Sequence, residues 1–89
     1  MRPELLARIE EICEKPAKNG RGPFSLYIGY EGPNSIFSAK GWTAIFAQTN
    51  FSGEYGNADD CATLEEALEK SVAAMSLHLG LPPVGGPPH

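Results

Sequence analysis

Apolar residues recur near the start of the chain with the spacing of an amphipathic helix. In RPELLARIEEICEK, residues 2–15, one stripe of the 3.6-residue period contains Leu5, Leu6, Ile9, Ile12 and Cys13. Pro3 suits the first turn, where its missing N–H matters least, and Pro16 cannot continue the helix. The pattern predicts one helix before Pro16, with Cys13 as a small core residue rather than a reactive thiol.

The next part of the chain changes to the two-residue period of β-strands. Alternation in FSLYIGYE, residues 24–31, predicts a half-buried strand whose buried face contains Phe24, Leu26, Ile28 and Tyr30. Short apolar runs predict a second strand at residues 35–39 and a third at residues 42–49. Gly41 lies between these two runs and suits either a tight hairpin turn or a bulge in one long strand; we favour the turn.

The strongest helix signal follows a polar stretch. NFSGEYGNADDCA, residues 50–62, contains two glycines and is predicted to be a long loop. Thr63 and Glu66 then form a T-x-x-E capping box, and Gly80 followed by Pro82 marks the end of the helix. The predicted buried stripe of this helix contains Leu64, Ala67, Leu68, Ser71, Val72, Met75 and Leu79.

The order of the elements predicts an α+β fold. Helix, three strands and helix (α-β-β-β-α) pack most simply as two layers, a three-stranded antiparallel sheet with two helices on one face. A chain of 89 residues suits a single domain. We expect this domain to cover residues 1–80, and we expect the Pro/Gly-rich residues 81–89 to form a disordered tail.

The net charge of -4 is unevenly distributed. Residues 1–40 carry six basic and five acidic side chains, whereas residues 41–89 carry six acidic side chains and Lys70 alone. An acidic domain repels phosphate backbones, so we expect no direct nucleic-acid binding and a basic protein partner instead, although mild acidity also simply favours solubility. With no signal-peptide or transmembrane pattern and no CxxC motif, we expect a soluble cytoplasmic protein that binds no membrane.

Asp59, Asp60 and Cys61 are the residues that most resemble a metal or catalytic cluster. A zinc site needs four ligands, usually in spaced pairs, and the two histidines, His78 and His89, are distant in sequence. Cys61 and His78 lie at opposite ends of the same predicted helix, about 20 Å apart by helical rise, which does not make a catalytic dyad. We therefore expect no catalytic residue, no metal and no cofactor, and no enzyme activity.

The stretch from GWTAIFAQT through Thr63–Leu68 to Leu77-His78-Leu79 resembles HicB-type antitoxins. That family places two or three strands before a helix that begins T-L-E-E-A-L, and the resemblance covers roughly half of the chain. It implies a protein that neutralises a partner. The family's P-D-L-P-G-C segment and its DNA-binding segment have no counterpart in this sequence, so autoregulation through DNA is not implied.

Two broader analogies concern the fold and the general character of the chain. The element order is similar to the double-stranded-RNA-binding fold, although the acidic composition argues against that function. A small acidic domain without a catalytic set is similar in character to phage-encoded anti-defence inhibitors such as anti-CRISPR proteins. An inhibitor and an antitoxin both need only a complementary surface, so the two remain open.

The function that we predict is a non-enzymatic protein-binding module that inhibits or neutralises a partner, and we expect this partner to handle nucleic acid. The predicted partner-binding residues are Trp42, Glu54, Tyr55, Asp59, Asp60, Glu65, Glu66 and Glu69. Exposed aromatic side chains such as Tyr27 and Phe37 would add contact area, and an open sheet edge would allow a homodimer. The alternative is an oligomer that binds a nucleotide or another small molecule through Lys18, Asn19 and Arg21.

Overall fold

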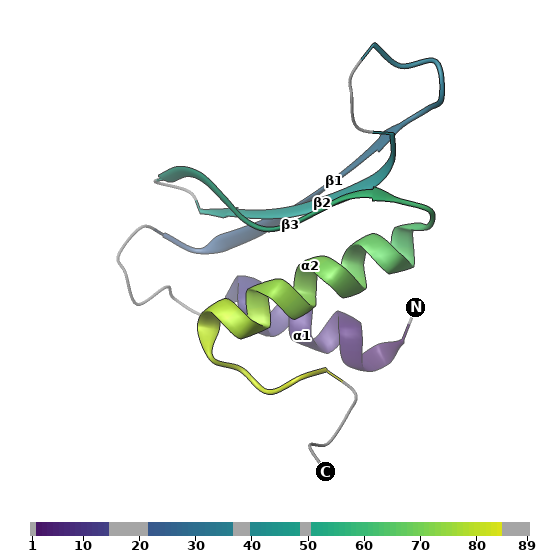
Figure 1. The fold of residues 1–89 in the computed structure, drawn as a ribbon. Helices are drawn as coiled ribbons and strands as arrows, with labels where there is room; N and C mark the ends of the chain where they lie inside the picture. The colour runs from purple at the N-terminus through teal and green to yellow at the C-terminus, as the bar shows by residue number, and fades with distance from the viewer. Residues whose placement is uncertain (1, 15–21, 37–39, 49–50, 85–89) are drawn as a thin grey trace.

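The computed structural model describes residues 2–14, 22–36, 40–48 and 51–84, with no account of the side chains of residues 51 and 52. The elements are α1 (Pro3–Glu14), β1 (Phe24–Glu31), β2 (Gly41–Gln48), β3 (Phe51–Cys61) and α2 (Leu64–Leu79). The strands form one antiparallel sheet in the order β1-β2-β3, and both helices lie on the same face of it (Figure 1). The predicted two-layer α-β-β-β-α architecture is confirmed.

Two of the three predicted strands were placed correctly, and the third lies elsewhere. The prediction of a strand at residues 35–39 is wrong for Ser35 and Ile36, which belong to the connection between β1 and β2; Phe37 lies outside the described residues. The segment predicted as a long loop is instead β3, which pairs with β2 from Phe51 to Cys61. No alternating pattern predicts this strand, because its composition is polar. β3 is an edge strand, and its pairing with β2 contains three register shifts.

Gly41 is neither a hairpin turn nor a bulge between two predicted strands. It is the first residue of β2 and lies opposite Glu31, with a φ of 82°. A Cβ atom at this position would lie 2.6 Å from the carbonyl oxygen of Cys61 on β3. Gly41 therefore has two reasons to be a glycine: its left-handed backbone and the close approach of β3.

The caps of α2 confirm the boundaries that the sequence predicts. The Thr63 hydroxyl accepts a hydrogen bond from the Glu66 N–H at 3.1 Å, and Gly80 ends the helix in the left-handed conformation. The predicted stripe is buried from Ala67 to Met75, whereas Leu64 is partly buried and Leu79 is 40% exposed. In this last part of α2 Ser76 is buried instead, and its hydroxyl accepts a hydrogen bond from Arg8 Nη1 of α1 at 2.8 Å.

Helix α1 lies beside α2 and runs in the same direction. Arg2 pairs with Glu69 at 3.1 Å, and six residues later Arg8 reaches Ser76 and the carbonyl oxygen of Pro82. Leu5 and Ile12 are buried, whereas Leu6, predicted on the same stripe, is 46% exposed. No helix in the described part of the chain is long and apolar enough to cross a membrane.

The packed structure continues beyond residue 80. Leu81 and Val84 pack against the core, although the sequence placed both in a tail; residues 85–89 lie outside the described part of the chain. The largest fully buried side chain of this core is Phe46, in β2. The segment before residue 85 therefore belongs partly to the domain.

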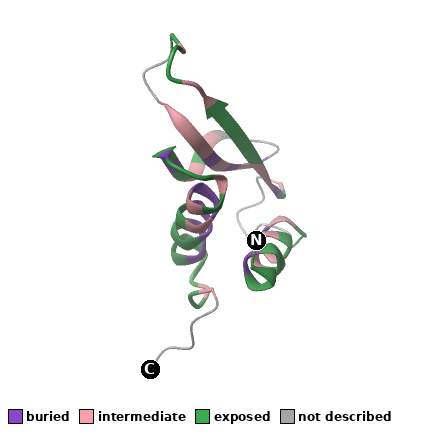
Figure 2. Ribbon diagram, turned by 90° about the vertical axis from the view of Figure 1, so that its right-hand side faces the viewer, coloured by how far each residue is buried: buried purple, intermediate pink, exposed green. Residues whose placement is uncertain are grey.

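The sheet extends beyond the helices that cover it. The β1–β2 hairpin rises away from α1 and α2 towards its loop, and the second half of β1 is exposed (Figures 1 and 2). Ile28 and Tyr30, which alternation placed on the buried face with Phe24, are 48% and 57% exposed. Ile28 and Tyr30 lie on the same face of β1 as Phe24, as the alternation predicts. In the second half of β1, however, no helix covers this face.

Candidate functional site

The last residues of β3 bring the predicted acidic cluster next to the start of β2. Cys61 lies opposite Trp42 in the sheet and is only 1% exposed, with its thiol 3.5 Å from the carbonyl oxygen of Asp59. Asp59 and Asp60 themselves are exposed. The thiol thus belongs to the core, while the two carboxylates face solvent at the same corner of the sheet.

Asp60 has a structural role in addition to its charge. It adopts a φ of 56°, and its Oδ1 accepts a hydrogen bond from the Lys40 N–H at 2.7 Å, directly before β2 begins. An aspartate tolerates this left-handed conformation better than most residues and can bond nearby backbone groups. Its carboxylate therefore helps to fix the corner where β2 and β3 meet.

The first turn of α2 adds further carboxylates to this corner. Glu65 is exposed, and Glu66 pairs with Lys70 at 3.1 Å, one turn along the helix. The hydrogen bond that the exposed Lys70 ammonium donates to Glu66 raises the pKa of Lys70. Within the part of the chain that the structure describes, no ion pair engages Asp59 or Glu65.

An aromatic pair borders the same corner. The Tyr30 ring lies on that of Trp42, with centroids 4.9 Å apart. Trp42 is half-buried against the core and Tyr30 is 57% exposed. Sequence reasoning missed Tyr30 as a surface residue, because alternation assigned it to the buried face; only the extent of the helices shows that it is uncovered.

Four of the eight predicted partner-binding residues gather at one place. We call this surface the acidic end, and it consists of Trp42, Asp59, Asp60 and Glu65. Glu66 lies beside Glu65 in the first turn of α2 but is paired with Lys70. The acidic end combines carboxylates with one large aromatic side chain, the composition that suits recognition of a basic protein surface.

The other three predicted residues lie elsewhere. Glu54 faces Ala47 towards the other end of β3 and accepts a hydrogen bond from Asn57 at 2.8 Å. Tyr55 packs inward, with its ring 5.4 Å from that of Phe24 and 5.1 Å from that of His78. Glu69 is bound to Arg2, so it supports the contact between the helices rather than the acidic end.

The alternative ligand-binding residues, Lys18, Asn19 and Arg21, lie outside the described residues. Among the residues that are described, no group of three His, Cys, Asp or Glu side chains is arranged to hold a metal ion. Burial raises the pKa of the Cys13 thiol, which favours its protonated form at neutral pH.

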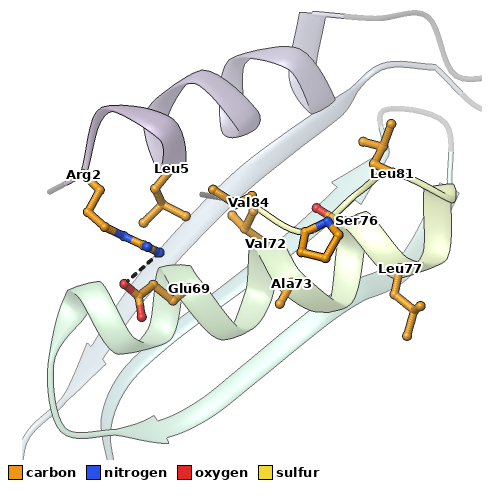
Figure 3. A pocket seen from close by; sticks show the side chains of 10 residues that line it. Arg2, Leu5, Glu69, Val72, Ala73, Ser76, Leu77, Leu81 and Val84 are labelled. Carbon is orange, nitrogen blue, oxygen red and sulfur yellow. Dashed lines mark ion pairs between the residues drawn. The ribbon is translucent and has the colours of Figure 1, made fainter. Parts of the chain in front are cut away.

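A groove of about 490 Å³ lies between α1, α2 and the segment that follows α2 (Figure 3). Its walls are mostly apolar, and the Arg2–Glu69 pair lies at its border. Its other polar residue, Ser76, already accepts a hydrogen bond from Arg8. We assign no ligand to this groove, because specific pockets add convergent polar groups that would orient one.

Comparisons with protein-family models, with curated proteins and with solved structures find no match to the chain. The resemblance to HicB-type antitoxins and the analogy with anti-defence inhibitors therefore stay predictions, and the candidate site rests on the geometry of the acidic end.

Proposed function

We propose that this protein is a small non-enzymatic protein-binding module that neutralises a partner by covering a basic surface with its acidic end. One observation carries the proposal: Asp59 and Glu65 are exposed beside Trp42 and are engaged by no ion pair within the described residues. Carboxylates that form no ion pair with the described residues keep their charge available for a second molecule.

The chemistry of the acidic end also indicates a class of partner. Proteins that handle nucleic acid carry clusters of Lys and Arg that bind phosphates. An acidic protein that occupies such a cluster competes with the nucleic acid, which would make binding inhibitory. Trp42 would contribute apolar contact area at the centre, since tryptophan is enriched among residues that dominate binding energy.

No residue is assigned a catalytic role in this proposal. His78 is exposed and its ring lies against Tyr55, whereas Cys61 is buried beyond the other end of α2. This separation supports a function through surface recognition. The reducing cytoplasm stays the predicted location.

The test is affinity capture from a bacterial lysate, with the bound proteins identified by mass spectrometry. The variant Asp59→Lys/Glu65→Lys reverses two charges of the acidic end, and the control Glu10→Lys/Glu54→Lys makes the same change in net charge at exposed positions away from it. Asp60 is left intact because it bonds the Lys40 N–H.

We expect a basic partner that the wild type and the control capture and the acidic-end variant does not. Capture should weaken as salt is raised, because exposed charges are screened over about 10 Å at 0.1 M ionic strength. Equal capture by both charge-reversal variants would show that the acidic end is not the binding surface.

A further inference from the structure

The two edges of the sheet differ in how well they are protected against pairing. Strand β3 has three register shifts against β2 and two residues with positive φ, Gly56 and Asp60. It also carries Glu54, Asp59 and Asp60. Bulges, bends and charges of this kind are the features by which natural proteins prevent an edge strand from binding another strand.

Strand β1 has fewer of these protections. Its eight residues pair with β2 without a register shift, from Phe24 opposite Gln48 to Glu31 opposite Gly41. FSLYIGYE contains no proline and no lysine, and its one charged residue, Glu31, is at the end. Among the described strands β1 has a neighbour on one side only, so its other edge presents alternate backbone N–H and C=O groups outward. One of the β1 backbone groups, that of Leu26, bonds the Cys13 thiol of α1.

Large side chains are exposed on both faces of this regular edge. Tyr27 is 57% exposed on the face away from the helices, and Ile28 and Tyr30 are 48% and 57% exposed on the other face. Figure 2 shows the second half of β1 as exposed. Exposed large side chains beside an open strand edge are typical of an interaction site.

We propose that β1 pairs antiparallel with β1 of a second copy of this chain, which joins the two sheets into one of six strands. The two-fold axis would be normal to the sheet at Tyr27. Residues directly opposite each other in an antiparallel pair lie on the same face, so the helices of both copies cover the same side of the joined sheet.

The second copy is the occupant because β1 complements itself. With Tyr27 opposite Tyr27, Ile28 lies opposite Leu26 of the second copy, and Tyr30 lies opposite Phe24. Phe24 and Leu26 belong to the half of β1 that packs with the core under the helices. The exposed half of each strand is therefore placed beside the covered half of the other, where its apolar side chains leave water.

This inference does not rest on the proposed function. Asp59, Asp60 and Glu65 are on β3 and the first turn of α2, on the far side of β2 from the pairing edge. The acidic end stays accessible in the dimer, and each copy would present one.

The test compares two isoleucine-to-lysine variants by analytical ultracentrifugation. Ile28→Lys places a charge in the proposed interface, and Ile36→Lys makes the same exchange at a residue that is 94% exposed in the β1–β2 connection. Circular dichroism checks that both variants are folded. The concentration range should run from about 1 µM to about 1 mM, which covers weak and moderate interfaces.

We expect the wild type and Ile36→Lys to dimerise, and the dimer of Ile28→Lys to dissociate about tenfold or more easily, because a buried isoleucine is exchanged for a charge. Hydrogen exchange of the wild type gives a second readout that needs no variant: amides of β1 should become protected as concentration rises. A wild type that stays monomeric, or a dimer without concentration-dependent protection in β1, would overturn the proposal. If the wild type is monomeric, the edge of β1 would be open to pairing with a strand of a different protein.

Discussion

The Tyr30 ring lies on the indole of Trp42, with centroids 4.9 Å apart and ring planes inclined by 51°. The two residues are directly opposite each other on β1 and β2, in the part of the hairpin that extends past the helices. The Tyr30 ring thus covers one side of the Trp42 indole, at a place in the sheet that the helices do not reach.

Removal of this cover should be visible in fluorescence, because Trp42 is the single tryptophan of the chain. We expect Tyr30→Ala to shift the emission of Trp42 to longer wavelength, since more of the indole meets water. An aromatic pair contributes about 0.5–1.5 kcal/mol beyond its buried area, so the free energy of unfolding should fall by a similar amount. The control is Tyr27→Ala, an equally exposed tyrosine on the other face of β1, which should leave the emission unchanged. An identical spectrum for Tyr30→Ala would contradict the stacking.

Glycine should be required at the start of β2 and dispensable in β1. Gly41→Ala adds a Cβ atom at a φ of 82° and 2.6 Å from the Cys61 carbonyl oxygen, so the backbone must move. We expect the free energy of unfolding to fall by more than about 1 kcal/mol. Gly29→Ala is the matched control, because its Cβ would meet nothing within 4 Å. Urea titrations of the two variants measure the difference, and equal stabilities would refute the close approach of β3.

Two buried serines of α2 should respond in opposite directions to the same substitution. Ser71 Oγ is buried and has no hydrogen-bond partner among the described residues, whereas Ser76 Oγ accepts from Arg8. Ser71→Ala removes an unsatisfied polar atom, so we expect it to raise the free energy of unfolding by about 1 kcal/mol. Ser76→Ala should lower it by about 1 kcal/mol, because a partly buried guanidinium loses an acceptor. Thermal unfolding of both variants measures the two changes in stability. Destabilisation by Ser71→Ala would mean that the Ser71 hydroxyl has a hydrogen-bond partner in solution.

Cys13 should make stability fall in alkaline solution. Burial, with a contribution from Glu14, raises the pKa of its thiol above the usual 9.0, against an opposing hydrogen bond from the Leu26 backbone. The folded protein therefore holds this proton more tightly than the unfolded chain. The stabilising contribution is complete below the unfolded pKa and is lost as pH rises through the folded pKa.

The measurement is the free energy of unfolding from about pH 7 to about pH 10, for the wild type and for Cys13→Ala. The wild type should lose more stability than the variant across the alkaline part of this range. Parallel curves would show that the thiol of Cys13 has the same pKa in both states.

The sequence by itself determined the elements whose signals are local. Thr63 and Gly80 define α2 because a cap depends only on the few backbone groups beside it. The two-residue alternation that starts at Phe24 was enough to find β1. Each of these inferences needs only neighbours in the chain.

Tertiary structure decided what depends on distant segments. Residues 51–61 became β3 because β2 supplies hydrogen bonds for their backbone, which no property of their polar side chains predicts. Tyr30 is exposed although its alternation is that of a buried residue, since burial depends on where the helices end. Glu69 is withdrawn from the acidic surface by Arg2, at the other end of the chain. Local chemistry selects helices and caps, whereas strand partners, burial and the composition of a surface depend on which segments the folded chain brings together.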